Sequence, residues 1–153
     1  MMRMTALKAL GAVLAAAAMA ALGSGSAEAG SATIGGRTMT CAAAKVVVSN
    51  QVPGPGFAVQ GMIMFGPKAL RAYPPLVQRL VFLHECGHQY VGTDETAADC
   101  WAIRSAKKQG WLNKSGLRQA CKALWHTEAD GAHLAGPERC DALKQCFEGG
   151  SAP

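Results

Sequence analysis

Six cysteines constrain the fold of this chain of 153 residues more than any other feature. In a small exported protein, an even number of cysteines is typical of a disulfide framework, although the sequence does not reveal which cysteines pair. No two of them form a C-x-x-C pair, so the spacing favours disulfides over a thiolate metal site. They are Cys41, Cys86, Cys100, Cys121, Cys140 and Cys146.

The N-terminal segment has the pattern of a secretory signal peptide. Arg3 and Lys8 give a positive start, an alanine-rich apolar run covers residues 9–22, and residues 27–29 read A-E-A, a cleavage pattern. The run is too short to predict a membrane anchor. We therefore expect residues 1–29 to be removed, and residues 30–153 to form a single periplasmic or secreted domain.

The charge of the chain does not favour nucleic acid as a partner. The formal net charge is +5, and the basic residues are scattered among neutral ones. A scattered excess of this kind usually only solvates a surface. We expect neither a nucleic-acid partner nor a stable membrane anchor after cleavage of the leader.

Strand-like segments come first in the predicted domain. Residues 31–40 are expected to form a loose arm or a short strand. The β-branched run at residues 45–50 predicts a strand, and residues 57–65 predict another with a bend at Gly61.

Apolar residues spaced three and four apart then predict about four helices. Their expected ranges are 75–91, 95–109, 116–125 and 137–147. Thr93 or Asp94 can cap the second helix, and Ser115 the third. The expected helix-packing residues are Trp101, Ile103, Trp111, Leu117, Leu124 and Trp125. A few strands followed by helices predict a small α+β domain cross-linked by disulfides.

The five residues from His84 to His88 read H-E-C-G-H, an H-E-x-x-H motif on the first predicted long helix. Residues four apart share a helix face, so both imidazoles can reach one metal ion, and Glu85 beside them can take a proton from water. The alternative is a pair of core histidines beside a surface glutamate. Two buried imidazoles would each need a hydrogen-bond partner, and one metal ion supplies both, so we favour a metal site.

Two carboxylates compete to be the third metal ligand. Asp94 falls where the H-E-x-x-H-x-x-G-x-x-H pattern places its third ligand, but that pattern has glycine where this chain has Val91. Glu95 opens the next predicted helix, and Asp99 lies one turn further on the same face. There Asp99 can accept the free N–H of a ligand histidine. Glu95 is the favoured ligand, with Asp94 as the alternative.

Cys86 and Cys100 lie close to these residues but are expected to face elsewhere. Cys86 is turned by roughly 200° from His84 around the helix, and Cys100 points away from the face of Glu95 and Asp99. We expect both to form disulfides, with each other or with the last two helices.

His84-Glu85-x-x-His88 followed by E-T-A-A-D at residues 95–99 resembles the H-E-x-x-H … E-x-x-A-D signature of gluzincin metallopeptidases, in particular the M48-type family. The resemblance implies a minimal, exported member with a small zincin-like fold and Zn²⁺ as its cofactor. The implied zinc ligands are His84, His88 and Glu95. Glu85 would be the general base, and Asp99 would support a ligand histidine.

The segment from Gly131 to Leu143 resembles the T-H-P … R segment of the same enzymes. His133 and Arg139 match its histidine and arginine, whereas Ala132 and Leu134 replace the threonine and the proline. The resemblance implies that His133 stabilises the oxyanion. Tyr90 and His126 are weaker candidates for that role.

The sequence thus predicts a zinc-dependent peptidase that hydrolyses peptide bonds of exported or envelope proteins by means of a metal-activated water. Its substrate would be a peptide or an unfolded protein. The resemblance implies that an edge strand binds the substrate, and residues 61–65 are either that edge strand or an ordinary core strand. The alternative is a non-catalytic, zinc-binding periplasmic module stabilised by disulfides. His133 would then close the fourth metal position.

Overall fold

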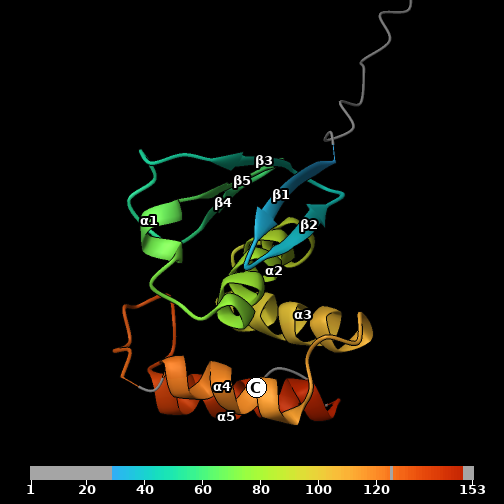
Figure 1. Ribbon diagram of the computed structural model, residues 1–153. Coiled ribbons are helices and arrows are strands. Elements are labelled where there is room, and N and C mark those ends of the chain that lie inside the picture. Colours follow the sequence, from blue (N-terminus) through green and yellow to red (C-terminus); the bar gives the residue numbers. More distant parts are fainter. Residues whose placement is uncertain (1–28, 125, 150–153) are drawn as a thin grey trace, which may run out of the picture.

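The predicted α+β order is confirmed. The computed structural model describes residues 29–124 and 126–149, in which five strands are followed by five helices (Figure 1). Residues 1–28 of the predicted signal peptide and Trp125 of the predicted helix-packing set lie outside the described residues. Within the described ranges, no helix combines the length and the apolar character needed to cross a membrane.

The strands form two small sheets. The first is an antiparallel hairpin, and the second has three strands in the order β3-β5-β4, with β3 parallel and β4 antiparallel to β5. Residues 31–40 thus belong to a two-stranded hairpin. The strands are β1 (Gly30–Ile34), β2 (Arg37–Cys41), β3 (Lys45–Val48), β4 (Phe57–Val59) and β5 (Met62–Phe65).

One expectation about residues 57–65 is wrong. They form the hairpin β4–β5 rather than one bent strand, because the chain reverses at Gln60 and Gly61, where the glycine takes a φ of +76°. Of the two alternatives for residues 61–65, the structure has the core strand, since β5 pairs on both sides. The edge strand next to the predicted site is β4.

The four long predicted helices are all present, and a single helical turn, α1, precedes them. Asp94 caps α3, as one alternative predicted, because its carboxylate accepts from the Ala97 N–H at 2.8 Å. Ser115 does not cap α4: the side-chain oxygen of Asn113 accepts from the Gly116 N–H at 2.9 Å. The helices are α1 (Pro67–Leu70), α2 (Pro75–Val91), α3 (Glu95–Lys108), α4 (Lys114–Leu124) and α5 (Gly136–Glu148).

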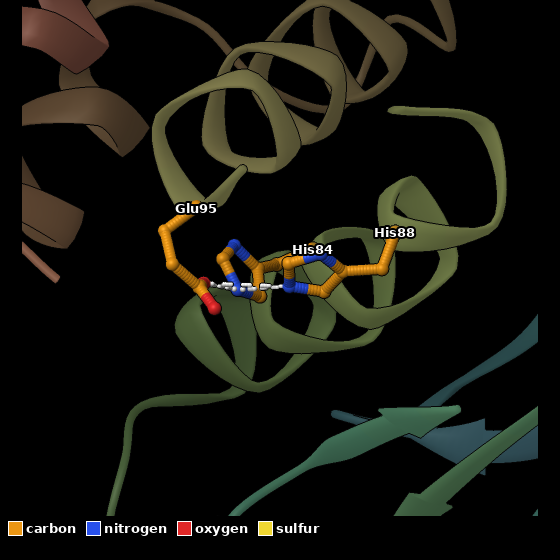
Figure 2. Close-up of side chains that lie close together, drawn as sticks. All are labelled: His84, His88 and Glu95. Carbon is orange, nitrogen blue, oxygen red and sulfur yellow. Dashed lines mark hydrogen bonds and ion pairs between the residues drawn. The ribbon is translucent and has the colours of Figure 1, made fainter. Parts of the chain in front are cut away.

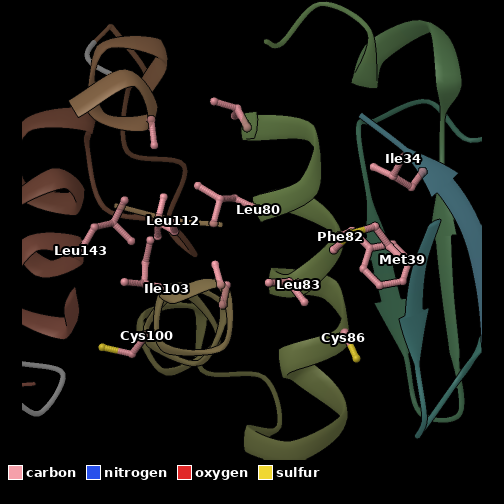
Figure 3. Close-up of a cluster of buried hydrophobic side chains, with 14 of the residues drawn as sticks. Ile34, Met39, Leu80, Phe82, Leu83, Cys86, Cys100, Ile103, Leu112 and Leu143 are labelled. Carbon is pink, nitrogen blue, oxygen red and sulfur yellow. The ribbon is translucent and has the colours of Figure 1, made fainter. Parts of the chain in front are cut away.

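Helix α2 lies between the strands and the C-terminal helices (Figures 1 and 3). Its Phe82 faces the strands and stacks on Phe65 of β5, with 5.3 Å between the ring centroids. Leu80 and Leu83 face the opposite way, toward Ile103 of α3 (Figure 3). Because apolar residues cover two of its faces, α2 carries the H-E-x-x-H motif through the middle of the molecule.

Among the described residues of the predicted helix-packing set, Ile103 and Leu117 are buried in the core. The partly buried members pack against it: Trp101, Trp111 and Leu124.

All six cysteines form disulfides, and each of the three bonds joins two different elements. Cys41–Cys86 joins β2 to α2, Cys100–Cys146 joins α3 to α5, and Cys121–Cys140 joins α4 to α5. Cys100 pairs with the last helix, as one alternative predicted. Cys86 forms a disulfide as predicted, but the partners expected for it are wrong, because the side of α2 turned away from His84 faces the strands rather than another helix.

We predict that replacing both Cys41 and Cys86 with alanine lowers the free energy of unfolding by roughly 2–4 kcal/mol. The bond closes a loop with a sequence separation of 45, so its loss returns chain entropy to the unfolded state. Denaturant unfolding followed by circular dichroism measures the change. An unchanged midpoint would mean that non-covalent contacts hold α2 against the strands without a contribution from this bond.

Candidate metal site

The site is built where α2 and α3 pack closely together. Gly87 makes this packing possible, because a Cβ there would lie 3.1 Å from the carbonyl oxygen of Ala98 in α3. Helix α2 ends at Gly92, whose φ of +76° favours glycine, and the chain re-enters a helix at Glu95. The start of α3 therefore lies beside the last turns of α2.

Three side chains point at one another across this contact (Figure 2). The Nε2 atoms of His84 and His88 are 3.2 Å apart. Oε2 of Glu95 lies 2.9 Å from the first and 3.3 Å from the second. Ligand atoms around a tetrahedral zinc with bonds of about 2.0–2.1 Å are separated by about 3.3 Å. These three residues can therefore hold a metal ion.

A second observation also fits a metal ion. Oε2 of Glu95 is buried, and Nε2 of His84 and Nε2 of His133 each lie 2.9 Å from it without the geometry of a full hydrogen bond. A cation bound at this oxygen would be surrounded by imidazole nitrogens, the ligand atoms that zinc prefers.

Of the two competing carboxylates, the structure brings Glu95 to the histidines. The ligand atoms of His84, His88 and Glu95 all lie within 4.8 Å of one another. Asp94 instead uses its carboxylate to cap α3.

In both histidines, Nδ1, the ring nitrogen that points away from the metal position, has a hydrogen-bond partner. His84 Nδ1 lies 2.8 Å from Oδ1 of Asp99, and His88 Nδ1 donates to the carbonyl of Gly92 at 2.6 Å. Since the Gly92 carbonyl can only accept, it fixes the tautomer of His88 in which Nδ1 carries the proton and Nε2 is free to bind a metal ion. Asp99 occupies the supporting position that the resemblance implies.

Arg139 of α5 completes this support. Its Nε and Nη2 donate to the two oxygens of Asp99 at 2.6 and 2.7 Å. Burial raises the pKa of Asp99, but the hydrogen bonds from His84 and Arg139 outweigh it and lower this pKa to about 2. The carboxylate therefore stays ionised and can accept from both partners at neutral pH.

The same network acts on the ligand residues. Burial lowers the pKa of His84, but its contacts with Asp99 and Glu95 outweigh this and raise the pKa to about 9. The contact with His84 holds the pKa of Glu95 below its usual value, against the effect of burial. Glu95 is thus a carboxylate, the form that binds a cation.

Glu85 lies beside the three ligands but is not one of them. Its side chain is buried, and burial raises its pKa although His84 and His88 act in the opposite direction. A Cβ on Gly56, in the loop before β4, would come within 2.7 Å of its Oε1. A buried carboxylate with a raised pKa suits a group that accepts and returns a proton near neutral pH.

His133 reaches the site from the loop between α4 and α5. Its Nε2 lies 2.9 Å from Oε2 of Glu95, and its Nδ1 lies 3.0 Å from a carboxylate oxygen of Asp130. The other two oxyanion candidates are less well placed. Tyr90 is exposed and stacks on Trp101, and His126 is exposed and lines neither of the hollows beside the site.

Two hollows in the surface of the protein meet at the candidate metal site. A groove of about 660 Å³ runs along β4, and a cavity of about 320 Å³ lies between α2 and the C-terminal helices. The residues common to both walls are Gly56, His84, Glu85 and His133. Sequence reasoning missed the contribution of Gly56, because nothing in the Pro- and Gly-rich stretch at residues 51–56 indicates its contact with Glu85.

Comparisons with models of protein families, with curated proteins and with solved structures found no match to this chain. The resemblance to gluzincin metallopeptidases therefore stays a prediction based on the motif residues.

We predict that Glu95→Ala lowers the affinity for a divalent metal ion by at least 100-fold, whereas Asp94→Ala leaves it nearly unchanged. The first change removes one of three ligands, and the second removes only a helix cap, at a cost of about 1 kcal/mol of stability. Calorimetric titration with Zn²⁺ measures both variants. A loss of affinity in Asp94→Ala alone would reverse the assignment.

We also predict that Asp99→Asn lowers the metal affinity by about 10- to 100-fold, because a neutral amide holds the imidazole of His84 less firmly and leaves Arg139 without its counter-charge. The same titration measures it. Asp141→Asn is the matched control, since that exposed carboxylate on α5 contacts Lys144 and not the site. Equal affinities in the two variants would contradict a supporting role for Asp99.

Proposed function

We propose that this protein is a zinc-dependent peptidase. The observation that carries the proposal is a buried carboxylate, Glu85, placed beside three metal-binding side chains without being one of them. Two histidines and one glutamate form the ligand set of catalytic zinc sites that keep a fourth position open. A bound zinc ion would polarise the scissile carbonyl and lower the pKa of water.

The residues of the chain supply the proton transfer and the positioning. Glu85 takes a proton from the attacking water and passes it to the leaving amine. Asp130 holds the ring of His133 through Nδ1, so Nε2 faces the site. In its imidazolium form the ring donates from both nitrogens, and Nε2 can then donate to the oxygen that becomes negative. Asp99 and Arg139 keep the imidazole of His84 in place.

The strand β4 offers a place for an extended substrate. It is an edge strand and lines the groove beside the site, so a peptide can add to it by main-chain hydrogen bonds. Gln89 fixes β4 to α2: its amide donates to the Val59 carbonyl at 2.9 Å and accepts from the Gly61 N–H at 2.7 Å. This arrangement favours peptides and unfolded segments over folded proteins.

The disulfides indicate the kind of compartment in which this activity would take place. Three such bonds are typical of proteins in an oxidising compartment. With the predicted signal peptide, they favour the periplasm or the extracellular space, and exported or envelope proteins as substrates.

One observation favours a second candidate, a non-catalytic zinc module. The Nε2 atom of His133 lies 2.9 Å from a metal-binding oxygen, close enough for the ring to become a fourth ligand. A site closed by four protein ligands stabilises the fold and has no position for a reacting water.

We predict that the oxidised, zinc-loaded protein cuts members of a mixed peptide library and that Glu85→Gln cuts them at least 100-fold more slowly, since the amide cannot accept the proton. Mass spectrometry identifies the products, and metal analysis verifies one zinc ion per chain in both proteins. Glu138→Gln is the matched control, an exposed glutamate in the first turn of α5.

Cutting that is equally fast in the wild type and in Glu85→Gln would contradict the proposed base. Cutting by neither, with one zinc ion still bound to each, would favour the non-catalytic module. His133→Ala would then test whether that ring closes the site.

A further inference from the structure

The cavity between α2 and the C-terminal helices reaches the proposed catalytic residues but lies apart from β4. Its volume is about 320 Å³, and His84 and Glu85 form part of its wall at the end nearest the metal site. The hollow is partly open to solvent, since the exposed Glu128 and Leu134 form part of its rim. Concave hollows of this volume are typical of sites that bind a small group.

The wall away from the metal site is apolar. Val77 and Val81 of α2 form one side, and Leu124 of α4 and Leu143 of α5 form another. Helices α4 and α5 are joined by the disulfide Cys121–Cys140, so the two helices that carry the second side are covalently linked. An apolar wall on linked helices suits a preformed pocket for an apolar group.

Four charged groups in the wall form two pairs. Asp99 is held by Arg139, and Asp130 lies against His133. Glu128 is exposed, and the buried Glu85 lies at the end nearest the metal site. A charged side chain that enters the apolar part of the cavity would lose its hydration, which is costly.

We propose that the cavity receives one large apolar side chain of the substrate, such as leucine, methionine or phenylalanine, from a residue next to the cleaved bond. This inference rests on the proposed peptidase function. Gly56 lies in the walls of both hollows, so a peptide in the groove along β4 can pass the site and direct a side chain into the cavity. The substrates are then segments with a bulky apolar residue, which folded proteins bury and unfolded ones expose.

The test measures binding separately from cleavage. Short alanine- and serine-based peptides with one variable central residue are titrated into the zinc-loaded Glu85→Gln variant. We expect leucine to bind at least tenfold more tightly than alanine, because burial of the larger side chain is favourable. We expect norleucine to bind at least tenfold more tightly than lysine, which has nearly the same shape but carries a charge.

Variants of Val81 in the Glu85→Gln background test whether the preference for leucine arises in the cavity. Val81→Phe fills the cavity and is expected to reduce the ratio of leucine to alanine affinity to near one. Val81→Ala enlarges the cavity and is expected to shift the preference from leucine toward phenylalanine. Val48→Phe is the matched control, since it makes the same change at an exposed position of β3 that lines neither hollow. Thermal unfolding verifies that each variant is folded.

Equal affinities for the leucine and alanine peptides, tighter binding of lysine than of norleucine, or no binding of any peptide would overturn the assignment of the cavity. So would a leucine preference that both Val81 variants leave intact. If Val81→Phe does not fold, the Val81→Ala variant and the peptide series together decide whether the cavity binds the apolar side chain. Cleavage by the wild type is scored separately: binding with a leucine preference but without cleavage refutes the peptidase and retains the pocket.

Discussion

The close contact between α2 and α3 determines where every metal-binding side chain lies. Gly87 lets the backbone of α3 approach at Ala98, and the three residues from Gly92 to Asp94 turn the chain so that Glu95 faces the last turns of α2. The bond between His84 and Asp99 crosses the same contact, and Arg139 extends it to α5. A Cβ at position 87 would lie 3.1 Å from the Ala98 carbonyl oxygen, so even an alanine there would push against the backbone of α3 beside the candidate ligands.

The covalent and the polar connections use different faces of the same helices. His84 and His88 face α3, while Cys86 on the opposite side of α2 is bonded to β2. In α3, Asp99 faces the site and the next residue, Cys100, is bonded to α5. A cluster of buried charged groups contributes little net stability, because desolvation offsets much of the attraction. The disulfides therefore hold the helices in place without occupying any metal-binding position.

The sequence was most informative where the chemistry is local. Helical periodicity and the spacing from His84 to Asp99 were enough to bring four side chains together, because all four lie on two consecutive helices. Pairings between distant segments could not be predicted: Cys86 faces β2 only because α2 packs on the strands, and β4 becomes the edge strand only because Gly61 reverses the chain. The contact of Gly56 with Glu85 and the cavity beyond it also depend on tertiary packing, which periodicity does not encode. The resemblance to zinc peptidases and the activity that it implies stay predictions.

The locality of the site has a consequence for how the molecule forms. The three metal-binding residues and Asp99 lie within residues 84–99, whereas the disulfides join cysteines with sequence separations of 45, 46 and 19. Closing a short loop costs little chain entropy, so contacts of this kind form rapidly in folding. The α2–α3 hairpin is thus the segment of this protein best suited to transfer, as one contiguous candidate metal site, into an unrelated helical scaffold.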